Sequence, residues 1–241
     1  MSRRLRSRPL IIAHRGASAV APEGTRAAIR AAVRAGADMV ELDVQMTRDG
    51  RLVAFHDDRL ERTTNGAGRV SDVPYARFAR LDAGSWFHAR FADERPLLVS
   101  QALRLTPRRM GINLELKRTP RRRALLQRLV RVVGGGVRRG LLISSFDTAL
   151  LRPLRPTGLP LALLCRTDAD RALRRAIRLG CSAWHPFYPL ATRRRIARAH
   201  AAGLRVHAWT VDEPSRARRL IRWGIDGVFT NDPARLRRLM G

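Results

Sequence analysis

The sequence predicts one α/β barrel, in which parallel strands alternate with helices. Short apolar runs recur along the 241 residues, amphipathic stretches separate most of them, and hydrophobic residues make up 45% of the chain. Repeated strand–helix alternation is typical of a parallel sheet. A length of about 250 residues is usual for a barrel that forms a single domain. We therefore expect residues 1–241 to form one catalytic domain.

Nine apolar runs have the length of strands, and eight of them fit barrel strands. The nine are Leu10–Ala13, Met39–Val44, Leu52–Phe55, Ile112–Leu116, Leu141–Ile143, Leu161–Cys165, Ala183–His185, Val206–Val211 and Gly227–Thr230. Leu52–Phe55 is the extra run, because no helix fits between it and the strand before it. Since Asp49-Gly50 is typical of a hairpin turn, we expect Leu52–His56 to pair beside the second barrel strand.

The stretches between most of these runs have the spacing of amphipathic helices. In Thr25–Ala35 the apolar residues recur on one helical face, and Thr192–Ala202 and Pro214–Trp223 behave alike. Residues 57–108 break the alternation with turn residues and clustered aromatics. We expect 57–108 to be a small inserted subdomain at the barrel mouth and, with residues 186–192, to shape a substrate pocket.

The chain is strongly basic. Lys and Arg number 48 against 20 Asp and Glu, which gives a formal charge of +28, and Lys117 is the only lysine. The arginines are spread along nearly every expected helix. Two interpretations stay open: solvated helix faces, or a field that attracts anionic partners such as nucleic acid, phospholipid surfaces or phosphate substrates.

The cysteines and the hydropathy of the chain indicate where in the cell the protein is located. Cys165 and Cys181 belong to opposite ends of neighbouring strands, about 15 Å apart, which is too far for a disulfide. We expect two buried thiols in a reducing environment. No apolar run reaches the length of about 18 residues that a spanning helix needs, and Pro9–Ala13 is too short for the apolar core of a signal peptide. These features predict a cytoplasmic protein.

Three carboxylates are expected at the ends of strands. Side chains alternate across a strand, so Glu41 and Asp43 face one way within Val40–Val44. Two carboxylates on an apolar strand repel each other, and Mg²⁺ or Ca²⁺ would remove that cost; a solvent-facing strand end or an arginine partner is the alternative. The same alternation aims Glu115 and Lys117 together. A lysine in a chain that otherwise uses arginine indicates a compact charge that approaches a phosphate or shares carboxylates, and chance survival of one lysine is the alternative.

Two histidines close expected strands. His14 ends the first barrel strand and His56 ends the hairpin strand, and barrel active sites are built from such ends. Two histidines suit general acid and general base work near neutral pH. Arg15 could bind a phosphate oxygen through the paired nitrogens of its guanidinium. Trp209 either faces the barrel mouth or is an ordinary core aromatic. The other histidines are expected to be structural: His88, His185, His200 and His207.

Short motifs along the chain occur in the order of a known family. They are His14-Arg15-Gly16, Pro22-Glu23-Gly24-Thr25, Glu41-x-Asp43, His56-Asp57, Arg62-Thr63-Thr64-Asn65-Gly66, Leu81-Asp82-Ala83-Gly84-Ser85-Trp86, Glu115-x-Lys117, Trp209-Thr210-Val211 and Thr230-Asn231-Asp232. Each motif is weak alone, but their ordered set is specific and covers Ile11 to about Asp232. By these motifs the chain resembles the glycerophosphodiester phosphodiesterases in their short cytoplasmic bacterial form.

The resemblance implies a TIM (β/α)₈ barrel with a small inserted subdomain after the second strand, where 57–108 fall. It also implies hydrolysis of a small-molecule glycerophosphodiester to sn-glycerol 3-phosphate and an alcohol, with Ca²⁺ or Mg²⁺ as cofactor. The roles it implies are metal ligation by Glu41, Asp43 and Glu115, with Glu23 as a fourth candidate, acid/base catalysis by His14 and His56, and phosphate contacts by Arg15 and Lys117.

Three positions depart from the family pattern. Gly24 stands where the family has asparagine, which removes a side-chain amide beside the expected metal site. Pro96-Leu97-Leu98 lacks the acidic residue that often follows, and Asp212 stands where the family has asparagine after Trp-Thr-Val. None of these departures removes an expected ligand or histidine.

Three other functions stay open. The same barrel could cleave lysophospholipids like a lysophospholipase D, and an acidic membrane surface would attract its charge. A nucleic-acid-binding protein is a rival from another class; aromatics make up only 5% and no usual binding motif occurs, so we expect non-specific binding if any. A barrel that only binds phosphodiesters is the third, and retention of both histidines and all three carboxylates argues against it.

Overall fold

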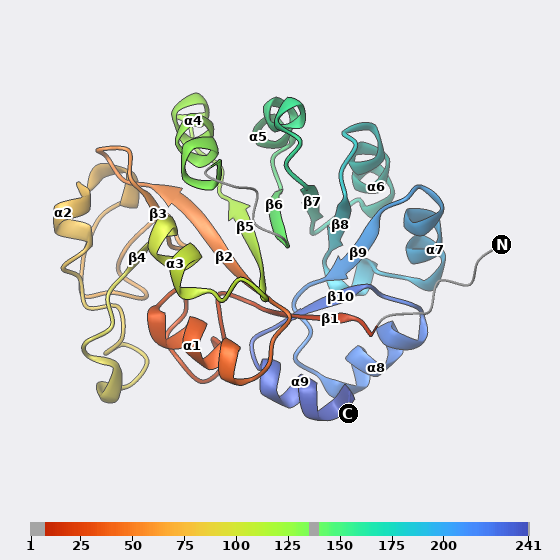
Figure 1. The fold of residues 1–241 in the computed structure, drawn as a ribbon, viewed down its shortest axis with the longest axis horizontal. Coiled ribbons are helices and arrows are strands. Elements are labelled where there is room, and N and C mark those ends of the chain that lie inside the picture. The colour runs from red at the N-terminus through yellow and green to blue at the C-terminus, as the bar shows by residue number, and fades with distance from the viewer. Residues whose placement is uncertain (1–7, 135–139, 241) are drawn as a thin grey trace.

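Eight parallel strands close into a barrel in the computed structural model, which describes residues 8–134 and 140–240 (Figure 1). In the order in which they pair around the barrel, they are β1 (Leu10–Ala13), β2 (Met39–Met46), β5 (Gly111–Leu116), β6 (Leu141–Ser145), β7 (Leu161–Cys165), β8 (Ala183–Pro186), β9 (Arg205–Ala208) and β10 (Gly227–Thr230). Pairing of β1 with both β2 and β10 closes the ring. The predicted TIM barrel is confirmed.

Two short strands extend the sheet beside β2. β3 (Leu52–Ala54) pairs antiparallel with β2, with Val44 opposite Ala54, and β4 (Leu97–Leu98) pairs antiparallel with β3. Gly50 has a φ of +82° in the turn between β2 and β3, a conformation that glycine adopts without steric cost. The predicted pairing of Leu52–His56 beside the second barrel strand is thus confirmed for its strand residues.

Helices surround the barrel (Figure 1). They are α1 (Arg26–Arg34), α3 (Val99–Leu105), α4 (Arg122–Val133), α5 (Thr148–Leu151), α6 (Ala169–Arg178), α7 (Arg193–Ala201), α8 (Pro214–Arg222) and α9 (Pro233–Met240). The short helix α2 (Tyr75–Phe78) lies outside this ring, in the segment between β3 and β4. Thr25 caps α1 because its side chain accepts a bond from the N–H of Ala28, and Thr192 caps α7 in the same way. The predicted helices lie where expected, to within one residue at each end.

The segment between β3 and β5 has a small apolar core of its own. Seven buried residues form this cluster, which is separate from the main core: Val53, Phe55, Leu60, Val70, Val73, Phe78 and Leu81. In contrast, Val99 and Ala102 of α3 belong to the main core, and α3 packs beside α1. We propose that the chain forms one domain and that the inserted subdomain, predicted over 57–108, ends near residue 98.

Both cysteines are free and buried, as expected. Burial raises the pKa of Cys165 and of Cys181 to about 11, so both thiols stay protonated at neutral pH. No helix within residues 8–134 and 140–240 is long and apolar enough to cross a membrane.

The interior of the barrel contains a buried histidine pair. His185 on β8 and His207 on β9 lie with Nε2 and Nδ1, respectively, 3.1 Å apart, and both rings are 2% exposed or less. Burial lowers the pKa of His207 to about 4 and that of His185 well below its ordinary value. Both imidazoles are therefore neutral in the folded protein at neutral pH, which agrees with their predicted structural role.

We expect these histidines to make stability fall in mild acid. In the unfolded chain an imidazole binds a proton below a pH of about 6.5, whereas in the folded protein His207 binds one only as the pH approaches 4. The contribution of the neutral imidazole to the free energy of unfolding is therefore fully present above about pH 6.5 and is lost as the pH falls toward 4. Urea unfolding from pH 7.5 to 5 should show a smaller loss for His207→Gln than for the parent, by about 2 kcal/mol. His88→Gln, which removes an exposed imidazole, is the control. Identical pH dependence in all three proteins would contradict this account.

Candidate active site

The expected site residues meet around one cavity at the carboxyl ends of the barrel strands. This cavity of about 250 Å³ is lined by His14, Arg15, Glu41, Asp43, His56, Glu115, Lys117 and Trp209, together with Phe146, Leu164, Arg166, Thr210 and Phe229. Asp43 on β2 lies directly opposite Glu115 on β5 in the sheet register. The alternation of side chains along these two strands places their carboxylates on one side.

Three of the carboxylates form a tight buried group. Glu41, Asp43 and Glu115 are 1%, 4% and 8% exposed, and one oxygen of each lies within 4.8 Å of the others. Burial, together with repulsion from Asp43, raises the pKa of Glu41 well above its ordinary value and that of Glu115 to about 7. Oε1 of Glu41 is buried and has no hydrogen-bond partner within residues 8–134 and 140–240. Such a group is unfavourable by itself and has the donor set that a hard cation requires.

Two cations offset part of this repulsion. Nζ of Lys117 lies 3.1 Å from Oδ1 of Asp43 and 2.9 Å from Oε1 of Glu115. Burial alone would raise the pKa of Asp43, but Lys117 and Arg15 outweigh it and keep that pKa below its ordinary value. The compact ammonium group of Lys117 thus pairs with two carboxylates at once, which is one of the two roles expected of this lysine.

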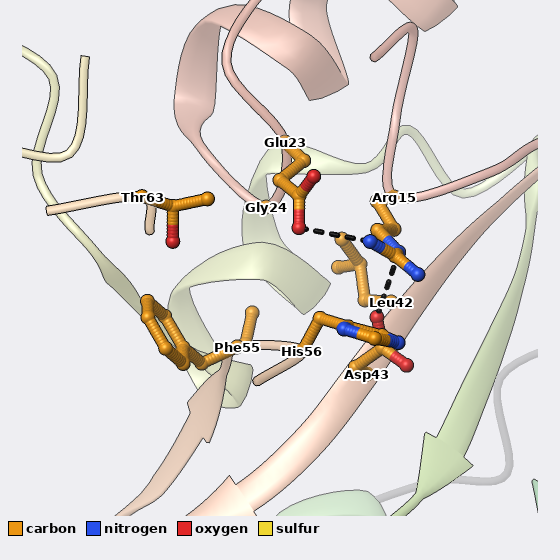
Figure 2. A pocket seen from close by; sticks show the side chains of 9 residues that line it. Arg15, Glu23, Gly24, Leu42, Asp43, Phe55, His56 and Thr63 are labelled. Carbon is orange, nitrogen blue, oxygen red and sulfur yellow. Dashed lines mark hydrogen bonds and ion pairs between the residues drawn. The ribbon is translucent and has the colours of Figure 1, made fainter. Parts of the chain in front are cut away.

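Arg15 connects the carboxylate group to the first strand. Its backbone N–H donates to Oε2 of Glu41 at 2.9 Å, and its Nε lies 3.3 Å from Oδ2 of Asp43. The backbone of Arg15 has a φ of +55°, which is rare for a residue with a side chain and is found where surrounding contacts impose it. Figure 2 shows its guanidinium between Glu23 and Asp43.

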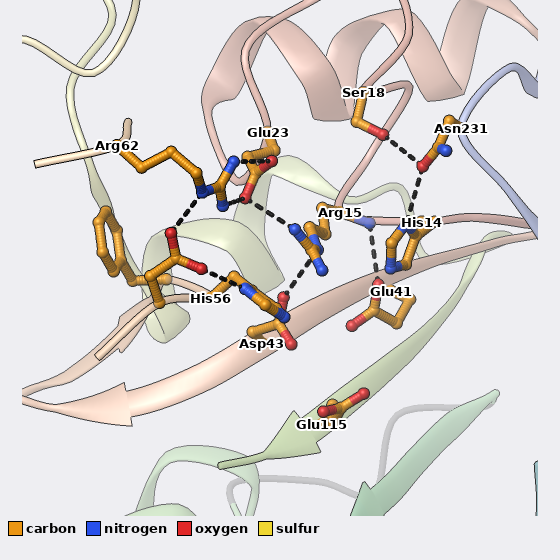
Figure 3. A network of polar contacts seen from close by, with 12 residues as sticks. His14, Arg15, Ser18, Glu23, Glu41, Asp43, His56, Arg62, Glu115 and Asn231 are labelled. Carbon is orange, nitrogen blue, oxygen red and sulfur yellow. Dashed lines mark hydrogen bonds and ion pairs between the residues drawn. The ribbon is translucent and has the colours of Figure 1, made fainter. Parts of the chain in front are cut away.

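Glu23 lies apart from the group of three carboxylates. Its carboxylate accepts bonds from Arg15 at 3.0 Å and from both terminal nitrogens of Arg62, at 2.7 and 3.1 Å. Arg62 also pairs with Asp57, so one guanidinium joins two carboxylates (Figure 3). The described structure therefore gives Glu23 two arginine partners and does not bring it among the other candidate ligands.

Each expected catalytic histidine has one ring nitrogen bonded outside the cavity. Nδ1 of His14 lies 2.7 Å from Oδ1 of Asn231, and Nδ1 of His56 lies 2.6 Å from Oδ1 of Asp57 (Figure 3). Burial lowers the pKa of both imidazoles, and the charge of Arg15 lowers it further. Both rings are therefore available as neutral bases near neutral pH.

Aromatic rings and an arginine form the opposite wall of the cavity. The ring of Trp209 meets that of Phe146 edge to face, with centroids 5.5 Å apart, and Arg166 lies over Trp209 with its Cζ 5.4 Å from the ring centroid. Trp209 donates from Nε1 to the carbonyl of His185 at 2.8 Å, which fixes its ring. Trp209 thus lines the mouth, the first of its two expected positions.

Several residues of this site have no role that the sequence pattern predicts. Phe146 and Arg166 directly follow β6 and β7, so their position after a barrel strand was an available signal. Asp57, Arg62 and Asn231 stood in the motifs, but their contacts depend on segments far apart in the chain. Only the fold shows that Arg62 reaches Glu23 or that Asn231 reaches His14.

Comparisons with known proteins agree with this geometry. The model of the glycerophosphoryl diester phosphodiesterase family matches residues 14–235. A glycerophosphodiester phosphodiesterase of Caldanaerobacter subterraneus is 34% identical over 235 residues, which cover 94% of this chain and 96% of the relative. One of Bacillus subtilis is 31% identical over 94% of this chain and 84% of the relative. Among solved structures, an Oleispira antarctica phosphodiesterase in complex with the product sn-glycerol-3-phosphate has a TM-score of 0.91 at 31% identity, with 97% of each chain covered.

The backbone explains why glycine occupies position 24. Gly24 has a φ of +69°, in the left-handed region that glycine adopts freely and that asparagine tolerates better than other residues. A Cβ added there would lie 3.2 Å from the carbonyl oxygen of Ala54, a tight contact. The exchange of asparagine and glycine at this position is thus compatible with one backbone shape.

We expect Gly24→Asn to be tolerated better than Gly24→Ala. The two variants add the same Cβ beside Ala54, so their difference isolates the left-handed backbone preference. Gly24→Ala should lose roughly 1 kcal/mol more unfolding free energy than Gly24→Asn. Urea denaturation of both variants and the parent measures this. Equal stabilities would show that the backbone at this position is not constrained.

Proposed function

Because this chain belongs to the glycerophosphoryl diester phosphodiesterase family, we propose that it hydrolyses glycerophosphodiesters to sn-glycerol 3-phosphate and an alcohol. It is a phosphoric diester hydrolase. The observation that supports this most strongly is the meeting of His14 and His56 with three buried carboxylates around one cavity. A site that only bound phosphodiesters would need neither a pair of histidines nor a group of like charges.

The buried carboxylates fit a divalent cation. Glu41, Asp43 and Glu115 would hold it, and Oε1 of Glu41, which has no hydrogen-bond partner among the described residues, is an oxygen that it would neutralise. Carboxylate oxygens alone favour Ca²⁺ or Mg²⁺ over metals that prefer nitrogen or sulfur. When bound, such an ion would polarise a phosphoryl oxygen and gather negative charge at the site. Glu23, which two arginines already neutralise, would orient Arg15 and complete no ligand set.

The histidines would move the protons of the reaction. One imidazole removes a proton from the attacking hydroxyl, which belongs to water or to the glycerol carbon next to the phosphoester, and a new P–O bond forms. The other, in its protonated form, gives a proton to the alkoxide as the bond from phosphorus to the departing alcohol breaks. Attack by water gives sn-glycerol 3-phosphate directly, whereas attack by the glycerol hydroxyl gives a cyclic phosphate that water then opens to the same product. Arg15 and Lys117 would contact the phosphate and neutralise the charge that builds on its oxygens. Trp209 would close one side of the substrate pocket.

Cleavage of lysophospholipids is the second candidate reaction. Phe146 is 46% exposed beside Trp209, so the mouth offers an apolar surface that an acyl chain could cover. The formal charge of +28 would favour encounter with an acidic membrane surface. Binding of nucleic acid, by the same charge, would be weak and non-specific. The two free thiols are consistent with a cytoplasmic location. The proposed reaction would give the protein a role in glycerol and lipid metabolism.

We expect metal-dependent release of sn-glycerol 3-phosphate from glycerophosphocholine. Activity should vanish in EDTA and return with Ca²⁺ or Mg²⁺, and Glu41→Ala should not recover because the ion loses a ligand. Asp170→Asn, which changes a partly exposed carboxylate on α6 that pairs with Arg195 and Arg198, is the control. Lysophosphatidylcholine is assayed alongside, and turnover of that lipid alone would favour the second candidate. No turnover of either substrate in any metal would contradict both.

His14→Ala and His56→Ala should each remove most turnover without unfolding the protein. Loss of a general acid or base lowers kcat roughly 100- to 10,000-fold. Melting temperatures should stay near that of the parent, because both side chains line a cavity. His88→Ala, which removes an exposed histidine, should keep parental activity. If either cavity variant turned over at the parental rate, the proposed roles would be wrong.

A further inference from the structure

A short chain of hydrogen bonds leads from His14 away from the cavity. Nδ1 of His14 lies 2.7 Å from Oδ1 of Asn231, and Nδ2 of Asn231 donates to Oδ2 of Asp212 at 2.6 Å. Asn231 directly follows β10, and Asp212 follows the segment after β9. The departure at position 212 therefore lies two contacts from a proposed catalytic histidine.

Asp212 determines which way the amide of Asn231 points. An ionised carboxylate only accepts hydrogen bonds, and Asp212 accepts three: from Oγ1 of Thr230 at 2.9 Å, from N–H of Asn231 at 2.7 Å and from Nδ2 of Asn231. The NH₂ of the amide must therefore face Asp212. The amide oxygen must face the opposite way, toward His14.

The amide oxygen in turn determines which nitrogen of His14 carries hydrogen. Oδ1 of Asn231 only accepts, and it also receives the hydroxyl of Ser18 at 2.9 Å (Figure 3). Nδ1 of His14 must therefore be the N–H donor, and in the neutral ring Nε2 carries the free lone pair. Since His14 lines the cavity and its Nδ1 points away from it, Nε2 is the nitrogen that meets the substrate.

We propose that Asp212 and Asn231 are a positioning pair that holds His14 in the Nδ1–H tautomer. This inference rests on the proposed function of His14, and every proton that His14 exchanges with substrate then passes through Nε2. His56 is also held in the Nδ1–H tautomer, because Asp57 accepts a hydrogen bond from its Nδ1 directly. Neither Asp212 nor Asn231 lines the cavity, so their effect on the reaction is through His14 alone.

Exchange of the two side chains distinguishes this role from a purely structural one. In Asp212→Asn, the oxygen of the new amide must still accept from the backbone N–H of Asn231, so its NH₂ faces the NH₂ of Asn231. Asn231 then turns, and its NH₂ meets Nδ1 of His14 and favours the wrong tautomer. In Asn231→Asp, two carboxylates face each other. The double variant D212N/N231D restores a donor opposite each acceptor and leaves a carboxylate oxygen for Nδ1–H.

The experiment measures the tautomer and the kinetics of the parent, both single variants and the double variant. Long-range ¹H–¹⁵N NMR spectra, in which His14→Gln identifies the His14 signals, should show the Nδ1–H form in the parent and the double variant and the Nε2–H form in D212N. We expect kcat to fall roughly 10- to 100-fold in each single variant with KM within about threefold, and to recover in the double variant. Ser18→Ala, which leaves Asp212 in control of the amide, should lower kcat less than about threefold.

Some results would overturn the proposal. An unchanged tautomer and kcat in D212N, or a double variant no more active than the single variants while melting at the parental temperature, would show that the pair only ties the ends of β9 and β10 together. The tautomer is read without substrate, so it remains informative even if the protein hydrolyses no glycerophosphodiester.

Discussion

Repulsion among three buried carboxylates, and the positive charges that offset it, set the arrangement of the strand ends in this barrel. Glu41, Asp43 and Glu115 lie on adjacent strands with their oxygens within 4.8 Å, although burial disfavours the charged form of each. Lys117 and Arg15 supply the nearest charges, and Arg15 adopts a left-handed backbone that brings its N–H to Glu41. This neutralisation is incomplete, because one oxygen of Glu41 has no hydrogen-bond partner in the part of the chain that the structure describes. The proposed cation is the element that would complete it.

A second layer of contacts holds the first one in place. Arg62 pairs with Glu23 and Asp57, and through them it reaches both Arg15 and His56. On the other side, Asn231 fixes His14. The residues of this layer come from loops after strands and from the inserted segment, so the barrel provides the direction of each side chain and the loops provide its partner. Precise placement of acids, bases and charges is the condition for the proposed hydrolysis.

The sequence was sufficient for the barrel and for most of the cavity. Strand length and alternation locate all eight barrel strands, and a strand places residues such as Glu41 and Asp43 on one face whatever its neighbours are. It was not sufficient for contacts between distant loops, such as Arg62 with Glu23, because no local period encodes them. The boundary near 98 that we propose, in place of the predicted 108, has the same origin: the packing of α3 beside α1 is tertiary, whereas turn composition is local. The glycine at position 24 became understandable only with its φ of +69°.

Glu41, Asp43 and Glu115 are proposed to bind one divalent cation together. Anomalous diffraction from crystals of the protein soaked in Mn²⁺, an ion that shares the oxygen preference of Mg²⁺, locates such an ion directly. We expect one strong peak bonded to all three carboxylates in the parent and none there in Glu41→Ala. No peak among these carboxylates, in crystals of protein whose activity requires the metal, would contradict it.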